Sequence, residues 1–338
     1  MGRGARTRRA TTTAALLTVA LAVSVVAGCT GTDRPGPVDD GRGTESDRSR
    51  SASPDQGEDQ WPPQSGLTGE SVLAVKIDNA RAARPHTGTD SADIVYAEQV
   101  EGGLSRLMAV YATKLPKAVG PVRSARESDL ELLRQFDNPT LAFSGAQGKL
   151  MPLIDKAPLN PQTPETTSGA YYRGTGKPAP HNLYLRPHRL APTAPGADAL
   201  TTGFTYGKAP SGGTKDTSET VRYPAASFTF SWSPSRGRYL VSMDGTPAVT
   251  TTGKRLAPAT VVVQYVKIRK SDFHDFLGNN TPYTETVGSG TAKVLRGGKA
   301  YDVDWERATA TDGTTFTTAD GAPVNFAEGQ VWVVFAKA

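Results

Sequence analysis

The chain has 338 residues and a formal net charge of +5 at pH 7. Its first 28 residues contain four arginines and no acidic residue, so the remainder carries a net charge of only +1. A nearly neutral chain without a block of Lys and Arg lacks the electrostatic footprint of nucleic-acid binding, and we expect no nucleic-acid partner.

The N-terminus predicts an export signal. A basic segment is followed by an apolar run over 14–27, which is too short and wrongly flanked for a stable membrane span. The run ends in Val26-Ala27-Gly28-Cys29, a pattern typical of a bacterial lipobox. We therefore predict a lipoprotein signal peptide over 1–28 and a lipid on Cys29 that anchors the mature protein to the extracytoplasmic face of the cell membrane. An ordinary signal peptide is the alternative, and Arg8-Arg9 leaves both Sec and twin-arginine export open.

Cys29 is the only cysteine in the chain. If it carries lipid, no thiol remains for a disulfide, a nucleophile or a cysteine-based metal site.

Residues 29–66 predict a disordered tether. They contain almost no aliphatic residue and many Gly, Pro, Ser and Asp, so they cannot bury enough apolar area to offset the entropy cost of ordering.

The segment 67–205 predicts a mixed α/β domain. Strand-like stretches lie at 71–79, 92–101, 104–113 and 139–145, with a turn at Gly102-Gly103. Helical periodicity covers 127–136 and a shorter helix is expected at 149–155. Strands interleaved with helices favour a mixed sheet with helical cover. Residues 156–220 are irregular and too long for a structureless connection, so part of them is expected to be packed or functional.

The segment 222–338 predicts a mainly antiparallel β domain. Strand candidates lie at 228–232, 239–245, 259–270, 290–307, 314–324 and 330–337, and "MDG", "RGG" and "ADG" are hairpin turn signals. The fold class expected for the whole chain is therefore α+β.

Several motifs in order resemble the YerB-like family of bacterial lipoproteins, known as domain of unknown function 3048. They are "VKIDNARAARPHTGTDSADIVYAEQVEGGLSRLMAVY", "VGPVRSAR" and "PHNLY" in the first half, and "GSGTAKVLRGGKAYDVDWER" and "DGAPVNFAEGQVWVVF" in the second. His86 departs from the Gln that is more common in the family. The resemblance implies a two-part extracytoplasmic fold but no activity.

The motif "GPVRSARE" over 120–127 raises the main functional question. Ser124 with Glu127, and Ser128 with Glu131, fit capping boxes, so Arg123 and Arg126 would flank a helix N-terminus. Cations are disfavoured there, and a bound phosphate or carboxylate would explain them. Pairing with nearby acids explains them equally well. For Glu101 and Arg106, across the hairpin, a salt bridge is the favoured role.

Outside this motif, the candidate catalytic residue is His181, as a general base near neutral pH. Asn182, Arg106 and Arg84 complete the candidate ligand-binding set with Arg123, Ser124 and Arg126. His181 and Asn182 have an alternative role in tying the irregular segment to the core. We predict no metal site and no cofactor, because the spacing of His181 and His188 fits no common zinc pattern.

Three function classes follow from these residues. The first is a membrane-anchored module that binds an anionic envelope ligand through the arginines. The second is a hydrolase or transferase acting on an envelope phosphodiester or glycan, and the third is a structural or interaction lipoprotein without ligand. The sequence leaves open whether the protein is an enzyme, which ligand it binds and its oligomeric state.

Overall fold

A computed structural model describes residues 71–275 and 277–338. The predicted signal peptide, Cys29 and the tether lie outside these residues.

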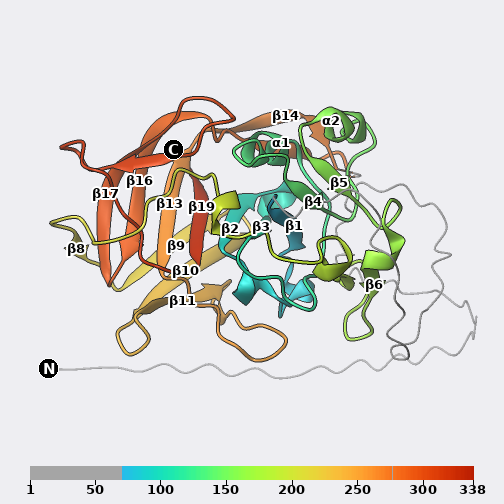
Figure 1. Cartoon of the computed structure of the whole chain (residues 1–338), viewed down its shortest axis with the longest axis horizontal. Coiled ribbons are helices and arrows are strands. Elements are labelled where there is room, and N and C mark those ends of the chain that lie inside the picture. The colour runs from blue at the N-terminus through green and yellow to red at the C-terminus, as the bar shows by residue number, and fades with distance from the viewer. Residues whose placement is uncertain (1–70, 276) are drawn as a thin grey trace, which may run out of the picture. The chain divides into compact units, whose positions relative to one another are not determined.

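A large mixed sheet dominates the described part of the chain (Figure 1). It has 11 strands, in the order β18-β17-β16-β13-β19-β2-β3-β1-β4-β5, and β8 pairs with β17. Their bounds are β1 Leu73–Asp78, β2 Ile94–Gln99, β3 Ser105–Tyr111, β4 Thr140–Ala142, β5 Asn160–Gln162, β8 Thr214–Lys215, β13 Thr260–Val266, β16 Gly288–Arg296, β17 Lys299–Arg307, β18 Thr315–Thr317 and β19 Val331–Lys337.

Smaller sheets and short helices complete the fold. An antiparallel sheet has the order β12-β11-β10-β9, and β14 with β15 and β6 with β7 form hairpins. Their bounds are β6 Tyr171–Arg173, β7 Leu183–Leu185, β9 Ser218–Tyr223, β10 Ala226–Ser233, β11 Arg238–Met243, β12 Thr246–Pro247, β14 Ile268–His274 and β15 Asn280–Thr284. The α-helices are α1 Glu127–Leu133 and α2 Met151–Lys156, and single 3₁₀ turns lie at Arg81–Ala83, Thr89–Ser91, Glu101–Gly103, Ser168–Ala170, Pro187–Arg189 and Ala197–Ala199.

The C-terminal strand β19 joins the two halves of the sequence. It runs parallel to β13 on one side, with Thr260 opposite Val331, and parallel to β2 on the other, with Val331 opposite Ile94. Parallel neighbours require long connections, so this pairing is formed between segments far apart in the chain. The expected strand at 330–337 is confirmed, but its position between β2 and β13 makes one continuous sheet out of both halves.

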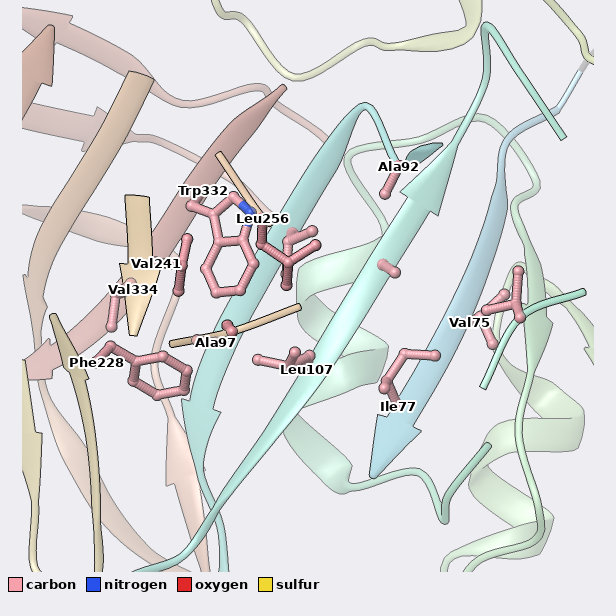
Figure 2. Packing of buried hydrophobic residues seen from close by; sticks show 14 of the residues in the cluster. Val75, Ile77, Ala92, Ala97, Leu107, Phe228, Val241, Leu256, Trp332 and Val334 are labelled. Carbon is pink, nitrogen blue, oxygen red and sulfur yellow. The ribbon is translucent and has the colours of Figure 1, made fainter. Parts of the chain in front are cut away.

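Both faces of the central strands of the large sheet are covered. On one face, side chains of β19 and β2 pack against β10 and β11, as Trp332, Phe228, Val241 and Ala97 show in Figure 2. On the other face, Val333 and Tyr96 belong to the cluster that contains Leu132 of α1 and Ile154 of α2. The central strands are therefore buried on both sides, which explains why all six residues of β1 are buried.

The fold is β-rich with few helices, which bears out only part of the expected class. The antiparallel hairpins predicted in the second half are present, as are short helices in the first half. The structure does not separate a mixed α/β domain from a β domain, because strands of both halves share one sheet.

Two local expectations need correction. The predicted helix over 127–136 ends at Leu133, and the continuous strand expected over 259–270 is divided into β13 and β14.

Trp332→Ala tests the packing between the large sheet and the sheet that contains β10 and β11. The indole is fully buried and makes edge contacts with Phe228 and Phe230, at ring-centroid distances of 6.2 and 5.8 Å. Removing it leaves a cavity between the two sheets, so we expect the free energy of unfolding to fall by about 3–5 kcal/mol in urea denaturation. Leu153→Ala, at a side chain 43% exposed on α2, is the control and should change it by less than about 0.5 kcal/mol. Equal effects of the two variants would contradict the packing described.

Candidate functional site

A row of charged side chains crosses the ends of three adjacent strands. In the register of the sheet, Asp78 of β1 lies opposite Arg106 of β3, and Arg106 lies opposite Glu98 of β2. Lys76, two residues before Asp78, belongs to the same face because side chains alternate along a strand. β1 and β2 both end here, which is the kind of sheet edge where ligand sites occur in open sheets.

Lys76 forms the centre of a buried ion cluster. Its Nζ donates to the carboxylate of Glu98 and to Asp129 Oδ1 of α1, the latter at 2.7 Å, and it is completely shielded from solvent. Ser128 Oγ donates to Glu98 Oε2 at 3.0 Å. Burial and the nearby Asp129 raise the pKa of Glu98. The cluster fixes the start of α1 on the sheet.

The two arginines of the "GPVRSARE" motif are buried and face acids of the protein itself. Arg123 Nε lies 3.3 Å from Asp78 Oδ2. Arg126 is paired with Glu101, with Nε 2.7 Å from Oε1 and a terminal nitrogen donating to Oε2 at 2.8 Å. Their exposed fractions are 4% and 6%.

These ion pairs outweigh the desolvation of the two carboxylates. Burial by itself would raise the pKa of each acid. The pKa of Asp78 and the pKa of Glu101 are nevertheless both lowered to about 2. For Asp78 the lowering comes from the hydrogen bond of His181 and the charge of Arg123, and for Glu101 from Arg126. Both acids are therefore ionised in the folded protein at neutral pH.

Arg106 does not form the salt bridge expected with Glu101, whose ion-pair partner is Arg126. One of its terminal nitrogens instead donates to the carbonyl oxygen of Ser124 at 2.7 Å. Burial, with Arg126 and Arg123 nearby, lowers the pKa of Arg106 to about 9. Arg106 thus holds the backbone of the motif against the sheet.

Ser124 is not the cap of α1, and the capping boxes expected from Ser124 and Ser128 are absent. The N-cap residue is Arg126, whose backbone N–H donates to Asp129 Oδ2 at 2.7 Å. Ser124 Oγ instead lies 3.3 Å from Ser144 Oγ. The helix N-terminus is occupied by the protein's own carboxylate, as the macrodipole favours.

His181 meets the arginine motif at Asp78. Its Nδ1 lies 2.7 Å from Asp78 Oδ2, the same oxygen that faces Arg123. An ionised carboxylate accepts the Nδ1 proton, which leaves the Nε2 lone pair available in the neutral ring. Nε2 makes no hydrogen bond within the described residues.

Asn182 acts within the irregular segment rather than at this site. Its Oδ1 accepts from Arg173 at 2.8 Å and its Nδ2 donates to the carbonyl of Gly174 at 3.0 Å. It therefore holds the hairpin of β6 and β7 together. The binding roles predicted for Arg123, Ser124, Arg126, Arg106 and Asn182 stay predictions.

Arg84 lies in the loop that follows β1 and is held on three sides. Its Nε donates to Asn79 Oδ1 at 3.0 Å, and its terminal nitrogens donate to Asn79 O at 2.6 Å and to Asp244 Oδ2 at 2.8 Å. Asp244 lies at the turn between β11 and β12, and its other oxygen accepts from the backbone of Ser227 at 2.7 Å. The guanidinium is thereby fixed in one orientation.

A cavity of about 290 Å³ lies beside Arg84, between this loop and the hairpin of β11 and β12. Its lining is Arg81, Arg84, Pro85, His86, Met243, Asp244, Thr246, Pro247, Ala248 and Val249. His86 is buried, its Nε2 lies 2.9 Å from the carbonyl oxygen of Asp78, and burial together with Arg84 lowers its pKa to about 4. His86 is thus neutral at physiological pH and donates to that carbonyl.

Sequence reasoning missed three residues of this region: Lys76, Arg81 and Asp244. Lys76 lies in a stretch predicted only as a strand, and the "MDG" turn predicted a hairpin but not its contact with Arg84. The run "ARAAR" beside a strand end was the available signal for Arg81.

Within 71–275 and 277–338, no cluster of three or more His, Cys, Asp or Glu is placed to hold a metal ion. The same residues contain no helix with the length and apolar character needed to cross a membrane.

Two family models match the chain, and both have no assigned function. The "Protein of unknown function (DUF3048) N-terminal domain" covers residues 60–200, and the corresponding C-terminal domain covers residues 219–333. The chain belongs to the DUF3048 family. The first match ends before β8 and the second begins within β9, so the large sheet contains strands from both.

A curated relative and a solved structure support this assignment. The chain is 24% identical over 283 residues to "Putative lipoprotein YerB" of Bacillus subtilis (strain 168), covering 79% of this chain and 81% of the relative. It is also similar to the crystal structure of YerB protein from Bacillus subtilis, with a TM-score of 0.66 and 20% identity, covering 80% of this chain and 91% of that one. The DUF3048 chain described here thus shares its fold with YerB. That relative is named as a lipoprotein, a class of protein that is anchored to a membrane through an attached lipid.

Asp78→Asn tests the ion pairs at the end of β1. The folded pKa of Asp78 lies below its ordinary value of 3.8, so its charge stabilises the protein above about pH 4 and this contribution disappears as the pH falls to about 2. The shift corresponds to about 2 kcal/mol. We expect the difference in unfolding free energy between wild type and Asp78→Asn to shrink by that amount from pH 6 to pH 2 in urea denaturation. Asp302→Asn, on an exposed position of β17, should show no such dependence, and a pH-independent difference for Asp78→Asn would contradict the assignment.

Proposed function

We propose that this protein is a membrane-anchored lipoprotein of the cell envelope that binds an anionic ligand in the cavity beside the end of β1. The observation that carries the proposal is the cavity of about 290 Å³ with arginines at its wall. This volume is at the lower end of the range of roughly 300–1,000 Å³ that is typical of small-molecule sites.

Arg81 and Arg84 give the cavity its charge. The side chain of Arg81 is 82% exposed, and its Nε lies 3.7 Å from Asp244 Oδ2, which Arg84 already engages. Two guanidinium groups thus share one carboxylate, and His86 is neutral, so the cavity has a net charge of +1. This favours an anion at the position that Arg81 can reach.

The buried arginines have a supporting part in this proposal. Arg123 and Arg126 face Asp78 and Glu101, which keeps the loop after β1 in place. Direct contact of either arginine with a ligand would need its carboxylate partner to be displaced, which is costly for a buried pair.

The location rests on two independent features. The sequence predicts lipidation at Cys29, and the relative YerB is named as a lipoprotein. A lipid on Cys29 and the tether that follows would place the cavity on the extracytoplasmic face, where phosphate and carboxylate groups of the envelope are accessible.

Arg81→Ala tests the proposed ligand contact. We expect ethyl phosphate to raise the melting temperature of the full chain, and its dissociation constant to rise about 10-fold in the variant. A charge-assisted hydrogen bond contributes about 1.5–3 kcal/mol, which accounts for that factor. Isothermal titration calorimetry measures it.

Arg222→Ala is the matched control, because Arg222 is an exposed arginine on β9 away from the cavity lining. It should bind the same anion as tightly as wild type. Binding that survives Arg81→Ala unchanged, or equal binding of ethanol and ethyl phosphate, would contradict the proposal.

A second candidate function is hydrolysis or group transfer on an envelope phosphodiester or glycan. The arrangement of His181 favours it, because a carboxylate on Nδ1 orients the ring so that Nε2 can take a proton from water or a hydroxyl. Asp78, next to Arg123, would then stabilise the imidazolium that forms.

His181→Gln tests this second candidate. If the dyad is catalytic, the full chain should release nitrophenol from bis(p-nitrophenyl) phosphate or a p-nitrophenyl glycoside. The variant should lose at least about 100-fold, the usual contribution of a general base. His188→Gln, at an exposed histidine, is the control, and identical rates for wild type and His181→Gln would rule out the dyad.

A further inference from the structure

We infer that the ligand of this cavity is amphipathic, with one anionic group and an apolar body. The inference rests on the proposed function and adds the chemical class of the ligand. Its basis is the separation of charged and apolar groups around the cavity.

The charged groups are gathered around Asp244. Arg84 donates to its carboxylate at 2.8 Å and Arg81 Nε lies 3.7 Å from the same oxygen. Arg84 has further hydrogen bonds to Asn79, so Arg81 is the cation with the greater freedom to meet a ligand. A ligand with a second anionic group nearby would face the carboxylate of Asp244, which disfavours polyanions.

The remaining wall is largely apolar. Its apolar members are Pro85, Met243, Pro247, Ala248 and Val249, and Met243 and Ala248 also belong to the buried hydrophobic cluster that includes residues of β10 and β11. His86 and Thr246 are its polar members. A sugar or glycerol unit would leave most of its hydroxyls without partners against the apolar part of this wall. An alkyl group instead gains the free energy of leaving water.

The affinity should therefore depend on chain length. Each buried methylene contributes a factor of about 4, so the dissociation constant should fall about fourfold per CH₂ along ethyl, butyl and hexyl phosphate until the cavity is filled. The measurement is isothermal titration calorimetry of the full chain below the critical micelle concentration. Octyl phosphate and nonanoate distinguish a phosphate from a carboxylate headgroup, and octyl glucoside supplies the uncharged control.

Thr246→Trp tests whether the cavity holds the alkyl chain. Thr246 is exposed and lines the cavity, so an indole there can occupy the space with little cost to folding. We expect the variant to bind hexyl phosphate no better than ethyl phosphate. Its unfolding free energy should stay within about 0.5 kcal/mol of wild type, which excludes misfolding as the cause.

The outcomes separate the two proposals. Equal affinity for ethyl and hexyl phosphate, with binding still lost in Arg81→Ala, overturns the amphipathic ligand and leaves the anion site intact. Octyl glucoside binding as tightly as octyl phosphate overturns both. The inference is supported if the affinity for alkyl phosphates increases with chain length in wild type but not in Thr246→Trp.

Discussion

The coverage of both faces of the central strands is the constraint on which the rest of the structure depends. Because one buried hydrophobic cluster covers one face of β1, β2 and β3, and a second cluster that includes residues of α1 and α2 covers the other, charged residues there have little access to bulk water. Lys76, with no exposed surface, must therefore be neutralised from within, and Glu98 and Asp129 do this. A buried cation is tolerated only where such partners are supplied.

The same constraint explains the arginine motif. Two cations beside a short helix suggested an external anion, but burial makes the nearest internal carboxylates the more favourable partners. Arg123 faces Asp78, and Arg126 donates to Glu101 Oε2 from one terminal nitrogen while its Nε lies 2.7 Å from Oε1. The motif therefore locks the loop, the helix start and the hairpin between β2 and β3 into one unit.

Local features were predictable from the sequence, whereas contacts between distant segments were not. Strands such as β2, β3, β16 and β17 were found because their turns contain paired glycines and their residues have high β-propensity. The insertion of β19 between β2 and β13 depends on packing and has no local signature. The contact between Arg84 and Asp244, 160 residues apart, is of the same kind, so the cavity itself could not be predicted even though Arg84 was singled out.

Asp78 connects the two candidate sites. Its carboxylate binds His181 and faces Arg123, while its backbone carbonyl accepts from His86 in the cavity wall. Replacing the carboxylate therefore affects both the dyad and the loop that carries Arg81 and Arg84, and cannot distinguish binding from catalysis. Arg81 and His181 have no hydrogen bond in common, so substitutions at these two positions separate the functions. The exposure of Arg81 makes it the more informative of the two, because its loss leaves the buried ion pairs unchanged.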